Sequence, residues 1–536
     1  NRNILTGPTE NDIMIQCKII FAEMRNRRIN MGMLNAAAVF SSNMVLQRGK
    51  NLNIWGTDCD GRTVTVDFCG STVSADVEHH KWSMILPAVN EYADGLAMTI
   101  SDGTETVVFD NICIGEVWLA GGQSNMELEL QNSLNGGEVL KTVSDSNVRF
   151  YYTKKNAYID DYFFIDERNG SWQTASEENS RCWSAVGFYF ARRLAAELGC
   201  TVGVIGCNWG GTSASAWISR DRLLTDADTR SYVDEYDEAM KDKTYDEYLR
   251  DLDDYRRWED AWQPKINEYY SLHPTDGNWD DAQAYAGSLS RWPEPLGPHS
   301  PFRAGGVYET MLRRVMPYTL AGFIYYQGES DDHKPNTYYK LLKMLIDQWR
   351  DDWKDDTLPM MLVQLPMFAN SGEEKDTNWS LIREAQMRVH DTVNHTGIAV
   401  ILDKGELNNI HPVEKETAGN RLALQAMYHV YKTISAEKAY GPIFSGYRYN
   451  DGGITAEFRY GENMHAEGEL SGFEIAGADR KFFPAKAEIK GSTVFISSDE
   501  VKKPVYARYN WVKYGSVTLF GKNGIPAAPF RTSRDD

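Results

Sequence analysis

The strongest structural signal in the chain is the stretch Gly115-Glu116-Val117-Trp118-Leu119-Ala120-Gly121-Gly122-Gln123-Ser124-Asn125-Met126. An apolar strand runs into a glycine pair, and a serine follows at once. Open α/β sheets bind ligands beyond the carboxyl ends of their strands, and glycines there allow a tight turn and close approach of a substrate. Ser124 is therefore a candidate nucleophile, although a serine in this position alone also suits a helix N-cap.

After this stretch, apolar strands alternate with amphipathic helices. Strands are predicted over 148–152, 202–205, 323–326, 360–363 and 398–402, and helices over 185–198, 338–349, 379–390 and 413–432. Pro412 suits the first turn of the last helix. The alternation predicts an α/β fold with a mostly parallel sheet that helices cover on both faces.

The length of 536 residues favours about three domains at ~150 residues each. Short alternating strands predict a β-sandwich-like domain over 34–110 and a second β-domain over 436–536. The α/β domain is expected over 111–435, with a helical insertion at about 221–300. Residues 1–33 show no clear element and are interpreted as a leader or a segment foreign to the native chain.

The composition of the chain disfavours some classes of binding partner. A net charge of −20 disfavours nucleic acid and anionic membrane surfaces, and no run reaches the ~18 apolar residues of a membrane span. Seven cysteines, with no CxxC pair, indicate reduced thiols rather than a disulfide framework or a zinc site. These features, and the lack of a visible signal peptide, favour a cytoplasmic protein, or a secreted one whose signal peptide has been removed.

Other loops that follow predicted strands carry groups that could assist Ser124 in catalysis. Trp209-Gly210-Gly211 offers backbone N–H groups, Gln327 offers a side-chain amide, and His411 offers a base. Each loop alone also suits an ordinary structural turn. Together, at one edge of the predicted sheet, they favour an acyl-transfer site.

These blocks resemble the sialate O-acetylesterase family within the SGNH (GDSL-like) hydrolases. The resemblance rests on Gly115 to Glu127, on Trp209-Gly210-Gly211-Thr212, on Tyr326 to Asp331, and on Ile410-His411-Pro412 followed by Gly419-Asn420-Arg421. Flanking segments from Asn43-Met44 to Phe530-Arg531 are also similar. The resemblance implies a three-layer α/β/α SGNH domain between the two β segments.

The resemblance also implies a mechanism. Ser124 attacks the acetyl carbonyl, His411 takes its proton, and the N–H groups of Ser124 and Gly211 with the Gln327 side chain hold the oxyanion. Water then releases acetate, without a metal or cofactor. Substrate contacts are expected from Gln123, Asn125, Trp209 and Glu329, although Trp209 equally suits the core and Glu329 can tie down a neighbouring loop.

One position departs from the family pattern. An aspartate usually stands three residues before the histidine and orients it, whereas this chain has Asn408. We expect a Ser–His dyad in which Asn408, or a nearby carboxylate such as Glu406, orients the imidazole. Arg383, Glu384 and Gln386 match another family segment and are interpreted as residues that anchor a helix.

The expected activity is serine-dependent hydrolysis of acetyl esters on a carbohydrate, with sialic acid as the sugar. Acetylated xylan or mannan remains an alternative, because the catalytic block recognises the acetyl group rather than the sugar. A catalytically weakened carbohydrate-binding homologue and a phospholipase or thioesterase, which would need an apolar acyl channel, are the other classes. The oligomeric state is not predicted.

Overall fold

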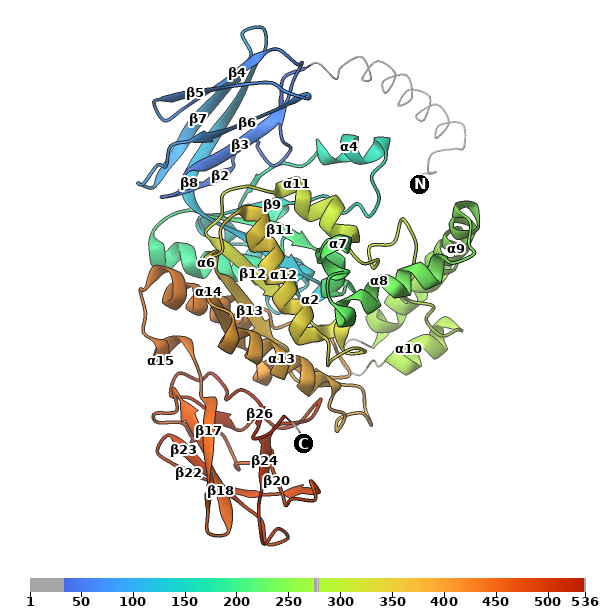
Figure 1. Ribbon diagram of the computed structural model, residues 1–536, viewed down its shortest axis with the longest axis vertical. Coiled ribbons are helices and arrows are strands. Elements are labelled where there is room, and N and C mark those ends of the chain that lie inside the picture. The colour runs from blue at the N-terminus through green and yellow to red at the C-terminus, as the bar shows by residue number, and fades with distance from the viewer. Residues whose placement is uncertain (1–32, 274–276, 278, 535–536) are drawn as a thin grey trace, which may run out of the picture.

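The computed structural model describes residues 33–273, 277 and 279–534. A β region, a region of mixed sheet and helices, and a second β region follow one another along its long axis (Figure 1). The predicted α/β fold with additional β segments is confirmed. The predicted leader lies outside the described residues, apart from Met33.

The N-terminal β region contains two groups of paired strands. Alternation of exposed and buried side chains along β4 places Val64, Val66 and Phe68 in the core. One group is β1 (Asn35–Ala36), β3 (Leu52–Thr57) and β6 (Lys81–Leu86), and the other is β2 (Val45–Gln47), β4 (Thr63–Phe68), β5 (Ser71–Asp76) and β7 (Ala93–Ser101) with β8 (Thr106–Gly122).

Strand β8 belongs to two regions at once. Its first half alternates in exposure and pairs with β7, whereas its second half is buried throughout and pairs with β11 and β12. Such continuous burial is typical of a strand covered on both faces. The predicted boundary at residue 110 falls inside this strand, because the change from alternation to continuous burial occurs without a break in the chain.

The central sheet has the order β10-β9-β11-β8-β12-β13-β15. Every neighbouring pair from β9 to β15 is parallel, and only the short β10 is antiparallel to its neighbour. The strands are β9 (Val148–Tyr152), β10 (Gln173–Thr174), β11 (Val202–Asn208), β12 (Gly322–Tyr326), β13 (Met360–Gln364) and β15 (Thr396–Val400).

Helices pack on both faces of this sheet. Trp118 contacts Phe190 of α6 on one face, and the backbone of Gly121 meets Trp349 of α12 on the other. Close packing of α6 on α14 requires Gly419, where a Cβ would lie 2.6 Å from that of Tyr189. The main helices are α6 (Ala185–Leu198), α12 (Tyr338–Trp353), α13 (Asn378–Thr392) and α14 (Glu416–Ala426).

The start of α14 corrects the sequence prediction. The helix was expected from about residue 413 with Pro412 in its first turn, but it begins at Glu416 and continues as a π-helical segment to Tyr431. Residues 408–415 instead form a loop, which presents His411 at the edge of the sheet.

The helical insertion follows the loop after β11. Its long helix α9 begins at a capping box formed by Thr244 and Glu247, and it packs through Trp262, Ile266 and Tyr269 against α10. The helices here are α7 (Arg220–Leu223), α8 (Ala227–Met240), α9 (Tyr245–Leu272) and α10 (Trp279–Ala286). Short helices elsewhere are α2 (Ser124–Glu127), α3 (Gly136–Leu140), α4 (Asp161–Glu167), α5 (Glu177–Ser180), α11 (Arg313–Val315) and α15 (Ala436–Ala439).

The C-terminal β region has its own core around Ile454, Ile475 and Ile496. Its larger sheets are β17 (Ile443–Asn450), β18 (Gly453–Arg459), β23 (Thr493–Ser497) and β22 (Lys486–Lys490), and β21 (Phe482–Pro484), β20 (Phe473–Ala476), β24 (Tyr506–Tyr509) and β26 (Phe530–Arg531). One small pair, β19 (His465–Ala466) with β25 (Leu519–Phe520), also belongs here, whereas the pair β14 (Phe368–Ala369) with β16 (Glu406–Leu407) lies in the central region, between β13 and α14.

Helix α13 joins this region to the central sheet. The buried Arg383 donates to four backbone carbonyls, those of Leu365 and Pro366 after β13 and those of Val512 and Lys513 in the C-terminal region. The anchoring role predicted for Arg383 agrees with these bonds. Across residues 33–273, 277 and 279–534, no helix is long and apolar enough to cross a membrane.

Candidate active site

Ser124 and His411, 287 residues apart in the chain, lie in direct contact. The distance between Nε2 of His411 and Oγ of Ser124 is 2.8 Å. Ser124 is the first residue of α2, directly after β8, and His411 lies in the loop before α14. The geometry suits removal of the serine proton by the imidazole, because a general base must lie within about 2.6–3.2 Å of the group it deprotonates.

The surroundings of His411 keep the imidazole neutral. The residue is exposed at the surface, yet the protein atoms around the imidazole desolvate it and lower its pKa to about 4. The charge of Lys415 lowers the pKa further, and that of Glu127 opposes both effects. A neutral imidazole can accept the serine proton at pH 7.

The structure does not bring Asn408 to the imidazole. Asn408 has a left-handed backbone (φ 62°), and its side-chain oxygen accepts hydrogen bonds from the N–H and the hydroxyl of Ser371. These bonds tie the histidine loop to the segment after β14. The predicted orienting role of Asn408 is therefore corrected to a role in loop structure.

Glu406 acts on His411 through an intermediate residue. It accepts a hydrogen bond from Nδ2 of Asn409 at 2.8 Å, and Oδ1 of Asn409 accepts from the backbone N–H of His411 at 3.0 Å. Both contacts hold the loop rather than the ring. Within the described part of the chain, Ser124 is the hydrogen-bond partner of the imidazole, which gives a dyad.

The glycine block lies against the nucleophile. A Cβ at Gly210 would lie 3.3 Å from Cβ of Ser124, and Gly211 has the positive φ of 75° that favours glycine. The N–H of Gly210 donates to Glu127 at 2.6 Å, whereas the N–H groups of Ser124 and Gly211 have no acceptor among the described residues. These two donors remain available for an oxyanion.

Gln327 does not supply the predicted third donor. Its Nε2 donates to Oδ2 of Asp331 at 2.6 Å and to the carbonyl of Thr212 at 3.3 Å, and its Oε1 accepts from the hydroxyl of Tyr338 at 2.9 Å. With both amide hydrogens engaged, the side chain connects β12 to the glycine block. The prediction of an oxyanion contact from Gln327 is corrected accordingly.

Three of the expected substrate contacts are buried structural residues. Oε1 of Gln123 accepts from the N–H of Ser330 at 3.2 Å, and Nδ2 of Asn125 donates to Glu329 at 2.6 Å and to the carbonyl of Ile410 at 2.9 Å. Their exposed fractions do not exceed 5%, so a substrate cannot reach these side chains. The fourth expected contact, Trp209, is half-buried and lines a pocket.

Lys415 is the main site residue that sequence reasoning missed. It is 1% exposed, and its ammonium donates to Oδ1 of Asn125 at 2.6 Å, while desolvation lowers its pKa to about 8. A lysine at the N-cap of α14 is unfavourable, because that position prefers Ser, Thr, Asp or Asn and repels positive charge. Because the sequence predicted a helix start near residue 413, this conflict became visible only in the structure.

No cluster of three or more His, Cys, Asp or Glu side chains in the described part of the chain could hold a metal ion. The groups that converge on Ser124 are a neutral imidazole and backbone N–H donors, which suit attack on an ester carbonyl.

Comparison with known proteins agrees with this chemistry. The profile of the family "Carbohydrate esterase, sialic acid-specific acetylesterase" matches residues 283–427, which include His411 and Lys415. Sialate O-acetylesterase of mouse (Mus musculus) is 24% identical over 74% of this chain and 73% of its own length. Sialate O-acetylesterase of Pongo abelii is 22% identical over 92% of this chain and 91% of its own length.

A solved structure is similar over almost the whole chain. The crystal structure of a carbohydrate acetylesterase from Xanthomonas citri has a TM-score of 0.74 and 25% identity, and the match covers 93% of this chain and 99% of that one. The resemblance drawn from the sequence motifs is confirmed: the chain is similar to sialate O-acetylesterases and to a carbohydrate acetylesterase over most of its length.

Proposed function

We propose that this protein is a serine-dependent carbohydrate O-acetylesterase in which Ser124 is the nucleophile and His411 is the base. The distance of 2.8 Å between Nε2 of His411 and Oγ of Ser124 is the observation that carries the proposal. Similarity to sialate O-acetylesterases and to a carbohydrate acetylesterase supports the class of enzyme, a carboxylic ester hydrolase.

The reaction runs through an acyl-enzyme. Oγ of Ser124 attacks the acetyl carbonyl while His411 accepts the serine proton, and the N–H groups of Ser124 and Gly211 donate to the oxyanion. His411 then gives its proton to the departing sugar hydroxyl. Water, deprotonated by His411, attacks the acetyl group on Ser124 and releases acetate and the free serine.

The sugar is a separate part of the proposal. Sialic acid is named for the mammalian relatives, and acetylated xylan or mannan is the alternative, since the catalytic groups bind the acetyl ester in every case. The polar lining of the pocket beside the glycine block argues against a long apolar acyl chain.

Finer structural predictions belong to the same proposal. We interpret the central sheet and its helices as a three-layer SGNH domain over about 111–435, with β-domains over 34–110 and 436–536. Parallel pairing from β9 to β15 supports this interpretation. A cytoplasmic location remains a prediction. The free, buried thiols of Cys113, Cys200 and Cys207 support it.

A serine-directed probe tests the mechanism. We expect a fluorophosphonate to label the wild-type protein, and Ser124→Ala to abolish both labelling and hydrolysis of p-nitrophenyl acetate. Ser445→Ala, which removes an exposed hydroxyl from the C-terminal region, is the control that retains both. Labelling that persists in Ser124→Ala, or equal rates on acetate and long-chain esters, would exclude the proposed activity.

A further inference from the structure

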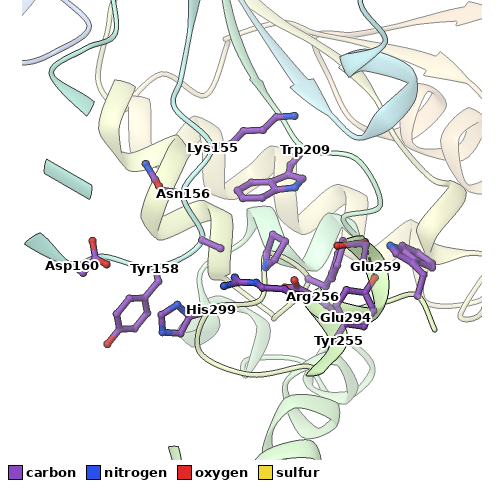
Figure 2. Close-up of a pocket in the computed structure, with 14 residues that line it drawn as sticks. Lys155, Asn156, Tyr158, Asp160, Trp209, Tyr255, Arg256, Glu259, Glu294 and His299 are labelled. Carbon is purple, nitrogen blue, oxygen red and sulfur yellow. Dashed lines mark hydrogen bonds between the residues drawn. The ribbon is translucent and has the colours of Figure 1, made fainter. Parts of the chain in front are cut away.

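A pocket of about 340 Å³ lies beside the glycine block (Figure 2). Its walls come from the segment 155–160, from Trp209, from residues 255–259 of α9 in the helical insertion, and from the loop 292–302 that follows α10. In Figure 2, Lys155 and Trp209 lie on one side, whereas Arg256, Glu259 and Glu294 gather on another. None of these residues takes part in the reaction proposed above.

The glycine block forms the wall between this pocket and the nucleophile. Gly210 lies against Ser124, and a Cβ at Gly211 would lie 2.8 Å from Cζ2 of Trp292 and 3.0 Å from Cε1 of Phe302. Lys155, which lines the pocket, also pairs with Glu127 of the nucleophile helix α2. The pocket therefore adjoins the nucleophile across the two glycines.

The aromatic side chains of the pocket offer flat apolar surface. Trp292 is 55% exposed, with one edge packed against Phe302 at a centroid distance of 5.7 Å, and Trp209 is half-buried. Large exposed aromatic groups within a polar pocket mark binding surface. The apolar face of a sugar ring can pack on such a surface.

Polar groups of the pocket suit hydroxyls rather than a charge. Oε1 of Glu294 is buried and has no hydrogen-bond partner among the described residues, so it lacks the partner that a buried acceptor requires. Acidic residues in the lining are Asp160, Glu259 and Glu294, and basic ones are Lys155, already paired with Glu127, and Arg256. Burial lowers the pKa of His299, which favours its neutral form.

We propose that this pocket is the subsite for the sugar ring of the substrate, which packs on Trp292 and Trp209 and donates a hydroxyl hydrogen bond to Glu294. The subsite recognises the ring face and the hydroxyls, and it does not use a carboxylate of the sugar. The inference rests on the proposed function of Ser124 and His411, and it assigns the choice of sugar mainly to the insertion and its loop.

Two variants and a matched control test the subsite. Trp292→Ala and Glu294→Leu should each lower kcat/KM about tenfold on a carbohydrate ester, a loss of the size that one aromatic contact or one charged hydrogen bond produces. On p-nitrophenyl acetate, which has no sugar, the loss in each variant should be several-fold smaller than on the carbohydrate ester. Trp279→Ala, in the same insertion but outside the pocket lining, should match wild type on both esters.

The carbohydrate ester for these assays is selected from the rates of the wild-type protein. An acetylated xylo-oligosaccharide, an acetylated manno-oligosaccharide and a 9-O-acetylated sialoside are compared, and the one hydrolysed fastest is used. Equal losses on this ester and on p-nitrophenyl acetate, or no loss on either, would overturn the subsite. Wild-type protein that cleaves no acetyl ester would instead remove the proposed function itself.

Salt distinguishes hydroxyl from charge recognition. Screening weakens attraction between exposed charges, so a carboxylate held by Arg256 would give a KM that rises with salt. We expect KM for the carbohydrate ester not to rise between 50 and 500 mM NaCl, concentrations spanning Debye lengths from about 14 to about 4 Å. A several-fold rise in wild type that disappears in Arg256→Met would overturn the hydroxyl assignment.

Discussion

The ammonium of Lys415 lies 2.6 Å from the side-chain oxygen of Asn125, the residue that follows the nucleophile. The amide nitrogen of Asn125 in turn donates to the carbonyl of Ile410, the residue that precedes the base, and to Glu329. One buried network therefore fixes the backbone on both sides of the Ser124–His411 contact.

Loss of Lys415 should destabilise the protein strongly. Lys415→Met removes the buried donor to Oδ1 of Asn125 and the positive charge near Glu329, and a buried polar group left unsatisfied costs about 1–3 kcal/mol. The free energy of unfolding in urea measures the loss. The double variant Lys415→Met/Glu329→Gln should recover part of it, because the remaining buried group is then neutral.

An exposed lysine provides the comparison. Lys340 pairs with Asp226 and Asp228 at the surface, where solvent and salt screen ion pairs, so Lys340→Met should change stability little. A loss in Lys415→Met no larger than in Lys340→Met would contradict the role given to the buried network.

Activity should persist to unusually low pH. The active form of His411 is the neutral imidazole, and protonation as the pH falls removes the base. Because burial and Lys415 lower its pKa to about 4, kcat/KM should stay level at pH 6.5, where an ordinary histidine is half protonated, and fall at lower pH. The measurement is kcat/KM on p-nitrophenyl acetate between pH 3.5 and 8, and an inflection at or above 6.5 would show that the environment does not lower this pKa.

Restoring the aspartate of the family pattern should not raise the rate. The Asn408 side chain contacts Ser371 and not the imidazole, so Asn408→Asp places no carboxylate on His411. We expect kcat on p-nitrophenyl acetate within about twofold of wild type, compared with ~10⁴ when a true orienting aspartate is altered in a serine protease. A rise of tenfold or more would mean that the loop can rearrange to bring residue 408 to the ring.

Removal of the Arg383 guanidinium should detach the C-terminal region from α13. Arg383→Met leaves four carbonyls without their donor, and an unsatisfied buried group costs about 1–3 kcal/mol, so a loss of about 3 kcal/mol or more is expected. Thermal unfolding followed by circular dichroism measures it. Arg388→Met removes an arginine of the same helix that packs on Tyr339, and it should have a smaller effect.

The alternation of strands and helices could be predicted because it depends on local pattern. The helix at 185–198 has the bounds of the sequence prediction, since Ser184 caps its first turn and Gly199 adopts the left-handed conformation that ends it. Ser124 and His411 could be paired because each follows a strand of one parallel sheet, and parallel strands bring their carboxyl ends to one edge.

The roles of side chains within the site could not be predicted in the same way. A sequence shows that Gln327 follows a strand, but not that Asp331 and Thr212 occupy both of its amide hydrogens. The roles of Asn125, Glu329 and Asn408 likewise depend on hydrogen-bond partners that are distant in the sequence. Residue type alone cannot distinguish a side chain that faces substrate from one that holds the loop behind it.

The continuity of β8 has a consequence for anyone who wishes to truncate this protein. Strand β8 ends just before the nucleophile, and its first half pairs within the N-terminal β region. Deletion of residues 34–110 would therefore cut into a strand shared by both regions. A trimmed enzyme would need Thr106 onward and a replacement for the neighbours that β7 and β2 supply. The N-terminal β region thus helps to position the reactive serine, and it cannot be removed or exchanged as an independent domain.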